Sequence, residues 1–338
     1  MREIVFLLIL AFIMFASCQD RNNNSEAQKN IIERIPLIFD TDANNELDDQ
    51  HALAYLLFNQ DIFDVKGMTV NATRNGGGVD QHYEEAARVM ELAKSMQDIP
   101  LLKGADADFM SIKDKLSEPE FDGQKAVDFI IEKANKAGQE KLIVLAVGKL
   151  TNIALAYAKA PEIIKKTRLV WLGSNYPESG EYNLDNDTTA LQYLIQQKIP
   201  FEMVMVRYGK PTGSDAVRVQ QKDILENVKG KGPQIENPIT GRHRGEFYNF
   251  GDYSASLFEH IEYYGDPPSR ALFDLVAVAI IKNPGWGEYK VVEGIQYSSN
   301  TWQKTDSEFG IGIWENFDKE KIIEDFYNTL EEPVIKAE

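Results

Sequence analysis

The chain of 338 residues carries 36 Lys and Arg against 53 Asp and Glu, a formal charge of −17, and a single Cys. This acid excess argues against nucleic acid as the main partner, because binding to phosphates needs clustered basic residues. One Cys excludes an intramolecular disulfide framework and a Cys-rich zinc site, while a hydrophobic fraction of 43% can fill a sizeable core. The acids either serve solubility or, in part, gather around a cation.

The first 17 residues have the pattern of a secretion signal. Residues 4–16 are an almost unbroken apolar run, shorter than the ~20 residues that a membrane-spanning helix needs. Cys18 follows residues 15–17 (FAS), and this arrangement resembles the lipobox of bacterial lipoproteins. We therefore expect a lipoprotein signal peptide over residues 1–17, a lipid on Cys18, and a lipid-anchored location in the bacterial cell envelope, on its periplasmic or outer-membrane face. An ordinary secretion signal with an incidental Cys is the alternative.

Residues 18–32 are polar and rich in Asn, which predicts a flexible tether. Beyond it, short apolar runs predict buried strands that alternate with helical patterns. The strands are expected at residues 35–39, 65–70, 141–147, 168–172 and 201–206, and the helices at residues 48–59, 83–95, 123–137, 151–158 and 188–197. This alternation is typical of βαβ units, so we predict an α/β fold: an open, mostly parallel, Rossmann-like central sheet flanked by helices.

The pattern becomes less regular after residue 206. Residues 230–251 are rich in Gly, Pro and Asn and predict a long loop or lid. Helices are expected again at residues 254–264, 270–282 and 319–331. Because no clear linker interrupts the chain, we expect one domain from residue 33 to residue 338.

Five acids lie within ten residues, directly after the first predicted strand: Asp40, Asp42, Glu46, Asp48 and Asp49. Asp40 and Asp42 are two residues apart and leave the strand on one face. Asp48 and Asp49 open a helix, whose positive dipole end tolerates them. Helix capping and a solvated surface explain part of the cluster. Carboxylates folded over one strand end repel one another unless a cation lies among them, and oxygen ligands favour Ca²⁺ or Mg²⁺ over zinc.

Two other motifs compete for these acids. An EF-hand loop that started at Asp40 would need Gly at its sixth position and Glu at its twelfth, where this chain has Asn45 and His51. That interpretation fails. A haloacid-dehalogenase-like phosphatase also begins with a strand and D-x-D, but it usually continues with Thr or Val where Asn44 stands here. A metal-dependent phosphatase therefore remains only a minor alternative.

Asp40-Thr41-Asp42, followed by Asp48-Asp49, resembles the opening motif D-T-D-P-G-x-D-D of the inosine-uridine-type nucleoside hydrolases. The chain departs from it by two extra residues, since residues 43–47 (ANNEL) replace Pro-Gly-x. Further segments that resemble family motifs follow in the same order: residues 146–154 (AVGKLTNIA), residues 181–187 (EYNLDND) and Phe273-Asp274. The resemblance covers about residues 36–285, and it implies a nucleoside hydrolase-like fold over the domain of residues 33–338.

Carried over residue by residue, the resemblance implies a Ca²⁺ site. Asp42, Asp49 and Asp274 would supply carboxylates, and Val147 would supply its backbone carbonyl. Asp42 would also be the general base for the attacking water. Asp48 would lie beside the ion and contact the sugar, with Asp40 behind these residues.

The resemblance also implies residues that hold the sugar hydroxyls. Glu181 and Asn183 are the first pair, since carboxylate and amide groups suit a polyol, and Asn175 is a further sugar contact. Residues 74–78 (RNGGG) follow a predicted strand, so we expect them to border the pocket, with Asn75 in contact with the sugar or the water.

The function implied by the resemblance is Ca²⁺-dependent hydrolysis of the N-glycosidic bond of a ribonucleoside or related N-riboside. Such a reaction passes through an oxocarbenium-like transition state, which carboxylates and a cation can stabilise. Phe273 stands where many members of the family have a His that protonates the leaving base. The remaining candidates for a proton donor are His82, His243, Arg244, Tyr248 and Trp171.

Phe273 also motivates a second hypothesis, a non-catalytic lipoprotein that binds ribose or nucleosides and retains the metal site. The partners expected on either hypothesis are a small nucleoside-like molecule and, through Cys18, a membrane. Members of the family are often dimers or tetramers, so a homo-oligomer stays open.

Overall fold

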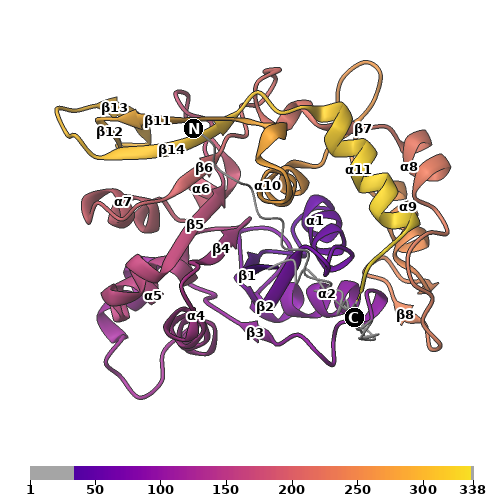
Figure 1. Cartoon of the computed structure of the whole chain (residues 1–338), viewed down its shortest axis with the longest axis horizontal. Helices are drawn as coiled ribbons and strands as arrows, with labels where there is room; N and C mark the ends of the chain where they lie inside the picture. Colours follow the sequence, from indigo (N-terminus) through magenta and orange to yellow (C-terminus); the bar gives the residue numbers. More distant parts are fainter. Residues whose placement is uncertain (1–33, 336–338) are drawn as a thin grey trace, which may run out of the picture. The chain divides into compact units, whose positions relative to one another are not determined.

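The computed structural model describes residues 34–335, and in this range eight strands form a central sheet (Figure 1). Their order is β11 (Glu288–Glu293), β14 (Gly310–Glu315), β6 (Glu202–Val204), β5 (Thr167–Leu172), β4 (Leu142–Ala146), β1 (Ile35–Thr41), β2 (Phe63–Val70) and β3 (Leu101–Lys103). All neighbours are parallel except β11, which pairs antiparallel with β14 at one edge. The predicted open, mostly parallel sheet is confirmed. The predicted signal peptide, the tether and Cys18 lie outside the described residues.

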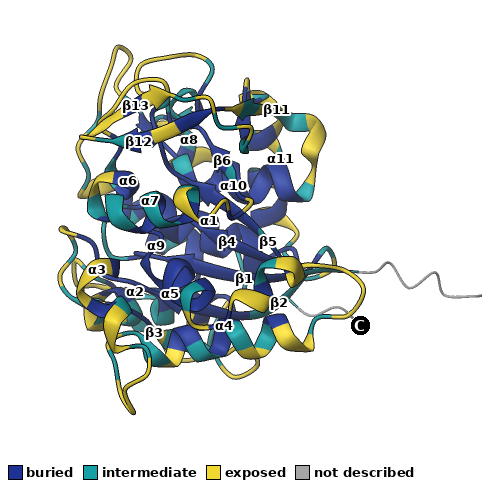
Figure 2. Ribbon diagram, turned by 90° about the vertical axis from the view of Figure 1, so that its left-hand side faces the viewer, coloured by how far each residue is buried: buried dark blue, intermediate teal, exposed yellow. Residues whose placement is uncertain are grey.

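Helices cover both faces of this sheet (Figure 1). One face of the sheet packs against six helices: α1 (Asp48–Leu57), α2 (Val79–Leu92), α8 (Gln221–Asn227), α9 (Phe250–Glu259), α10 (Phe273–Lys282) and α11 (Lys319–Glu331). The other face packs against five: α3 (Phe109–Ile112), α4 (Gln124–Lys136), α5 (Thr151–Lys159), α6 (Tyr182–Asn186) and α7 (Thr188–Gln196). Successive strand residues enter opposite cores, as Leu37 and Phe39 do against Ile38. The inner strands are therefore apolar on both sides and buried (Figure 2).

The predicted strands and helices of the first 206 residues are all present, with ends shifted by a few residues. The short β3 was not predicted, nor were the edge strand β11, whose residues are mostly exposed, and its neighbour β14. An exposed edge strand has no continuous apolar run, so periodicity does not reveal it. Smaller ribbons pair β7 (Arg218–Val219) with β10 (Arg270–Ala271), β8 (Ile239–Thr240) with β9 (Glu246–Phe247), and β12 (Ile295–Ser298) with β13 (Thr301–Lys304).

Two of these small sheets, β8–β9 and β7–β10, explain two predicted boundaries that were wrong. The segment predicted as a loop over residues 230–251 contains the β8–β9 hairpin, and α9 begins at Phe250, where the Asn249 side chain caps it. The helix predicted from residue 270 begins only at Phe273, because Arg270 and Ala271 pair with β7. Within the described part of the chain, no helix combines the length and apolar character that crossing a membrane requires.

The side of the sheet to which successive strands are added changes between β1 and β4. From β1 the chain runs outward through β2 and β3, then returns to β4 on the other side of β1 and continues through β5 and β6. The two crossover connections therefore diverge at the carboxyl ends of β1 and β4 and leave a crevice, the position at which open parallel sheets bind ligands. The segments that follow β1 and β4 are those that carry Asp42 and Val147.

Candidate active site

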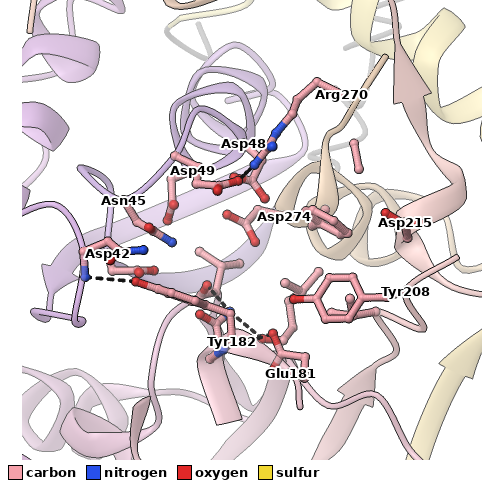
Figure 3. A pocket seen from close by; sticks show the side chains of 18 of the residues that line it. Asp42, Asn45, Asp48, Asp49, Glu181, Tyr182, Tyr208, Asp215, Arg270 and Asp274 are labelled. Carbon is pink, nitrogen blue, oxygen red and sulfur yellow. Dashed lines mark hydrogen bonds and ion pairs between the residues drawn. The ribbon is translucent and has the colours of Figure 1, made fainter. Parts of the chain in front are cut away.

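A cavity of about 410 Å³ opens at the carboxyl ends of β1, β4 and β5 (Figure 3). Eight of the residues predicted from the sequence line it together: Asp42, Asp48, Asp49, Asn75, Val147, Glu181, Asn183 and Asp274. They come from six separate segments of the chain, and the sheet and helix ends bring them to one place. Two predicted residues, Asp40 and Asn175, do not line it.

Four buried carboxylates converge at one end of this cavity, and we call them the acid cluster: Asp42, Asp48, Asp49 and Asp274. Asp48 and Asp49 lie in the first turn of α1, and Asp274 lies in the first turn of α10. One carboxylate oxygen of each of these three residues lies within 4.8 Å of the others. Two helix N-termini thus point at the same spot, where their dipoles favour negative charge.

Asp42 faces these three acids from the end of β1 (Figure 3). Its Oδ2 accepts a hydrogen bond of 2.6 Å from the Thr73 hydroxyl, which holds the carboxylate in place. A Cβ on Gly148 would lie 2.9 Å from Asp42 Oδ1, so only glycine allows the segment after β4 to approach this closely.

Burial dominates the electrostatics of the acid cluster. It raises the pKa of Asp42 and of Asp48 from 3.8 to about 7, and it raises the pKa of Asp49 and of Asp274 well above 3.8. Repulsion among the four carboxylates acts in the same direction. At neutral pH the cluster must therefore either retain protons or have its charge compensated by a cation.

Asp40 lies beneath the acid cluster and is fully buried. It accepts hydrogen bonds from Thr69 Oγ1 (2.5 Å), Asn71 Nδ2 (2.7 Å) and Asn152 Nδ2 (2.7 Å). Burial raises its pKa to about 6 even though these hydrogen bonds oppose the shift. Asp40 thus ties β1 to β2 and to α5 without lining the cavity.

The segment Leu150–Asn152, at the start of α5, also links elements that lie around the cavity. Asn152 donates to Asp40, while its Oδ1 accepts the backbone N–H of Ala105 at 2.8 Å. Thr151 Oγ1 donates to Asp187 Oδ2 at 2.5 Å, which links this segment to the one that carries Glu181. Neither Thr151 nor Asn152 lines the cavity, so this motif positions the site without contacting its contents.

Glu181 and Asn183 lie opposite the acid cluster, at the start of α6. The Glu181 carboxylate caps this helix by accepting the N–H groups of Asn183 (3.0 Å) and Leu184 (2.9 Å), as well as that of Ser174 (2.9 Å). The Asn183 amide donates to the carbonyl oxygen of Val147 at 2.7 Å. Hydrogen bonds therefore fix all three groups before any ligand enters, and the Val147 oxygen keeps a second lone pair.

Asn75 and Asn175 differ in position. Asn75 lines the cavity, and its backbone N–H donates to the hydroxyl of Tyr182 at 3.1 Å. Asn175 lies outside the lining, where its amide donates to the carbonyl of Ser179 and accepts the N–H of Tyr208 at 3.0 Å. It therefore holds the loop that carries Tyr208.

None of the proton donors suggested by the sequence lines the cavity: His82, Trp171, His243, Arg244 and Tyr248. Trp171 is fully buried and donates to the Gly148 carbonyl, and His82 is buried beneath the 43–47 loop. His243 stacks on His260 at a ring separation of 4.4 Å. Instead, sequence reasoning missed several donors that do line it: Tyr182, Tyr208, Arg218, Tyr264 and Arg270.

Phe273 lines the cavity beside Asp274 and packs edge-to-face on Tyr208, with ring centroids 5.8 Å apart. The Tyr208 side chain points into the cavity (Figure 3). Burial, followed by the charges of Glu181 and Asp48 among others, raises the pKa of Tyr208, so its hydroxyl keeps its proton. No local pattern in the sequence indicates Tyr208, because it reaches the cavity from a loop after β6.

Comparison with known proteins places this geometry in context. The family model described as inosine-uridine preferring nucleoside hydrolase matches residues 37–324. The chain is 31% identical over 112 residues to an uncharacterized protein of Schizosaccharomyces pombe, covering 31% of this chain and 36% of that protein. It is 28% identical over 178 residues to the non-specific ribonucleoside hydrolase RihC of Klebsiella pneumoniae, covering 46% of this chain and 56% of that protein.

The matches thus span from about a third to just over half of the length of these curated relatives. Among solved structures, the plant nucleoside hydrolase PpNRh1 superimposes with a TM-score of 0.68 at 18% identity. That superposition covers 89% of this chain and all of the other, and it shows a shared fold.

Proposed function

Because this chain belongs to the inosine-uridine preferring nucleoside hydrolase family, we propose that it hydrolyses the N-glycosidic bond of a ribonucleoside or related N-riboside in a Ca²⁺-dependent reaction. The observation that carries the proposal is the acid cluster at the carboxyl ends of the central strands. Four buried carboxylates face a carboxylate and an amide, Glu181 and Asn183, across one cavity of about 410 Å³. That volume suits a small polar molecule.

The residues present fit a divalent cation. Their donor atoms are carboxylate and carbonyl oxygens, which Ca²⁺ prefers, and it takes 6–8 of them. Three acids bring oxygens within 4.8 Å of one another, and Asp42 and the Val147 carbonyl line the same cavity. The raised pKa values of the acid cluster support this assignment, since a bound cation would offset the burial and the mutual repulsion that raise them.

The chain's own groups divide the remaining chemistry. When bound, Ca²⁺ would hold the sugar hydroxyls and the attacking water and lower the pKa of that water. Asp42, held by Thr73, accepts the proton of the water as it attacks the anomeric carbon. Asp48 and Glu181 stabilise the positive charge that develops on the sugar. Glu181 and Asn183, fixed by their own hydrogen bonds, orient the sugar.

The leaving base needs its own stabilisation, and Phe273 has no proton to offer. We assign this interaction to the Tyr208 hydroxyl, which points into the cavity beside Phe273 and keeps its proton. The partner atom on the substrate would be a ring nitrogen or a carbonyl oxygen of the base.

The replacement of a proton donor by Phe273 also favours a second candidate function. A ribose- or nucleoside-binding protein would need the acid cluster, Glu181 and Asn183, but it would not need to activate a leaving group. Binding without turnover is therefore the outcome to distinguish from catalysis.

One assay tests both functions. The purified domain, supplied with Ca²⁺, is incubated with a panel of purine and pyrimidine nucleosides, and free base and reducing sugar are measured. Release of base supports the hydrolase. Absence of turnover across the panel, with Ca²⁺-dependent nucleoside binding by calorimetry in verified folded protein, selects the binding protein.

The proposed location is the bacterial cell envelope, with a lipid on Cys18 and cleavage after residue 17. Support comes only from the sequence of residues 1–18. Metabolic labelling with a fatty acid in a bacterial host tests this: the wild type is labelled and Cys18→Ser is not. Light scattering of the purified domain decides whether it is a homo-oligomer.

A further inference from the structure

The Tyr182 side chain joins two segments that meet beside Asp42. It extends from the start of α6 toward Asp42 (Figure 3). Its hydroxyl contacts residues 73–78 (TRNGGG), which follow β2 and which we call the 73–78 loop: it donates to Thr73 Oγ1 at 3.2 Å and accepts the backbone N–H of Asn75 at 3.1 Å. Tyr182 lines the cavity, whereas Thr73 is buried and does not line it. One hydroxyl therefore links the cavity wall to the residue that holds Asp42.

The hydrogen bonds at this hydroxyl form a chain with a single direction. A Thr or Tyr hydroxyl has one proton to donate and lone pairs with which to accept. Thr73 donates its proton to Asp42 Oδ2 at 2.6 Å, so its oxygen is left to accept the proton of Tyr182. The Tyr182 oxygen accepts in turn from Asn75. Every proton in the chain thus points toward the Asp42 carboxylate, and hydrogen bonds aligned in this way strengthen one another.

Further contacts hold the 73–78 loop against α6. The Arg74 guanidinium lies over the Tyr182 ring, 4.4 Å from its centroid, and the backbone N–H of Arg74 donates to Asn186 Oδ1 at 2.7 Å. Residues 76–78 are three consecutive glycines, which have more backbone freedom to lose than other residues. The contacts with α6 offset that loss and keep the start of the loop, with Thr73, in place.

Resting on the proposed function, we propose that Tyr182 is a positioning residue whose hydroxyl orients the Asp42 carboxylate through Thr73. The Thr73 hydroxyl can hold Asp42 only while its own proton points at Oδ2. Because Tyr182 donates to the Thr73 oxygen, it keeps that proton in this direction. Oδ2 is then committed to Thr73, and Oδ1 is left to accept the proton of the attacking water. Orienting the general base before the substrate binds raises kcat more than it raises affinity.

A double-mutant cycle on kcat tests whether Tyr182 acts through Thr73. Tyr182→Phe and Thr73→Val each remove one hydroxyl and keep the shape of the side chain. Each should lower kcat by about tenfold and change KM by less than about twofold. The double variant should lose no more than either single variant, because one break already interrupts the chain. The losses should be equal for a nucleoside and for a 4-nitrophenyl riboside, since the general base acts on both.

A matched control comes from another Tyr–Thr pair of the chain. The Tyr157 and Thr167 hydroxyls are hydrogen-bonded at 2.8 Å, and neither residue lines the cavity. Tyr157→Phe should therefore leave kcat and KM unchanged. The melting temperature confirms that each variant is folded. Losses that multiply in the double variant would overturn the proposal, and so would a rise in KM alone, which would make Tyr182 a sugar contact.

A second measurement does not depend on turnover. Asp42 is also a proposed ligand of the cation, so the Kd for Ca²⁺ by calorimetry should weaken by about tenfold in each single variant and no further in the double variant. If the wild type hydrolyses a riboside while the losses multiply, only this proposal fails. If it binds Ca²⁺ but hydrolyses nothing, the proposed hydrolysis fails and the calorimetric cycle decides whether Tyr182 positions Asp42. If it does neither, this proposal falls with the proposed function.

Discussion

The two ends of the cavity are built from different kinds of structure. The acid cluster lies on the end of β1 and on the first turns of α1 and α10, elements packed into the core of the sheet. A second part of the lining, which we call the aromatic end, consists of Tyr208 and Phe273, which pack on each other. Phe273 begins α10, whereas Tyr208 lies on the loop after β6. Tyr208 keeps 39% of its surface exposed, although its hydroxyl lies near Glu181 and Asp48, where burial raises its pKa.

This difference assigns the two proposed tasks to different parts of the cavity: bond cleavage to the acid cluster and selection of the base to the aromatic end. Carboxylates anchored on buried elements keep their geometry whatever base is attached to the sugar, so under the proposed function the acid cluster would cleave the N-glycosidic bond. Loop residues can change without disturbing the sheet, so under the proposed function Tyr208 would contact the base, the part of the substrate that varies. The departure at Phe273 marks the border between these two ends, since its neighbour Asp274 belongs to the acid cluster.

The largest effect should come from removing the base at the cluster. Asp42→Asn keeps the size of the side chain and its hydrogen bond from Thr73 but cannot accept the proton of the water. We expect kcat to fall by about 10³-fold. Steady-state kinetics at saturating Ca²⁺ measures this, with circular dichroism to verify folding. A kcat within tenfold of the wild type would remove Asp42 from the role of general base.

The pH dependence of Ca²⁺ binding should be the next largest effect. In the cation-free protein the pKa of Asp42 and of Asp48 is raised from 3.8 to about 7. The folded state therefore holds protons that the unfolded chain has released, so the free energy of unfolding falls as pH rises from about 4 to about 7. Ca²⁺ must displace these protons, and its apparent affinity should rise by about 100-fold between about pH 6 and about pH 8.

Thermal melts with chelator and with excess Ca²⁺, across the same pH range, measure both effects. The melting temperature with chelator should fall toward neutral pH, and the gain on adding Ca²⁺ should grow. A gain in melting temperature that does not vary with pH would show that the acid cluster is not where Ca²⁺ binds.

The aromatic end should have a smaller effect that depends on the leaving group. Tyr208→Phe removes one hydroxyl and keeps the ring contact with Phe273, so we expect kcat/KM for a nucleoside to fall by about tenfold. A 4-nitrophenyl riboside, whose leaving group is a stable anion and needs no proton, should be hydrolysed by Tyr208→Phe at the wild-type rate.

Phe273→His restores a proton donor beside Asp274 and is expected to raise turnover of nucleosides selectively. Equal losses for both substrates in Tyr208→Phe would show that Tyr208 acts on folding or sugar binding instead.

The smallest effect on turnover should come from behind the cavity. Asp40→Asn replaces an acceptor of three hydrogen bonds with a group that must turn a donor toward at least one of its neighbours. We expect the free energy of unfolding to fall by about 2 kcal/mol, while kcat changes only a few-fold. Urea denaturation compared with kinetics separates the two, and a loss of kcat comparable to that of Asp42→Asn would mean that Asp40 belongs to the catalytic machinery.

The sequence by itself determined the alternation of strands and helices up to residue 206 apart from the short β3, the mostly parallel sheet, and three members of the acid cluster: Asp42, Asp48 and Asp49. These features follow from local patterns: apolar runs of strand length, and acids placed at the end of one strand and the start of one helix. Asp274 and Glu181 were found because short motifs mark them, even though they lie far along the chain from Asp42.

Only the tertiary structure decided which side chains contact the rest of the cavity. Tyr208, Arg270 and Asn45 belong to no local pattern, because their positions depend on loops held by residues distant in sequence, as Arg270 holds Glu46. For the same reason the sequence pointed to His82 and Trp171 as proton donors, and the fold buries both away from the cavity. Periodicity reports which face of an element is buried, whereas the direction of a loop side chain is set by long-range contacts.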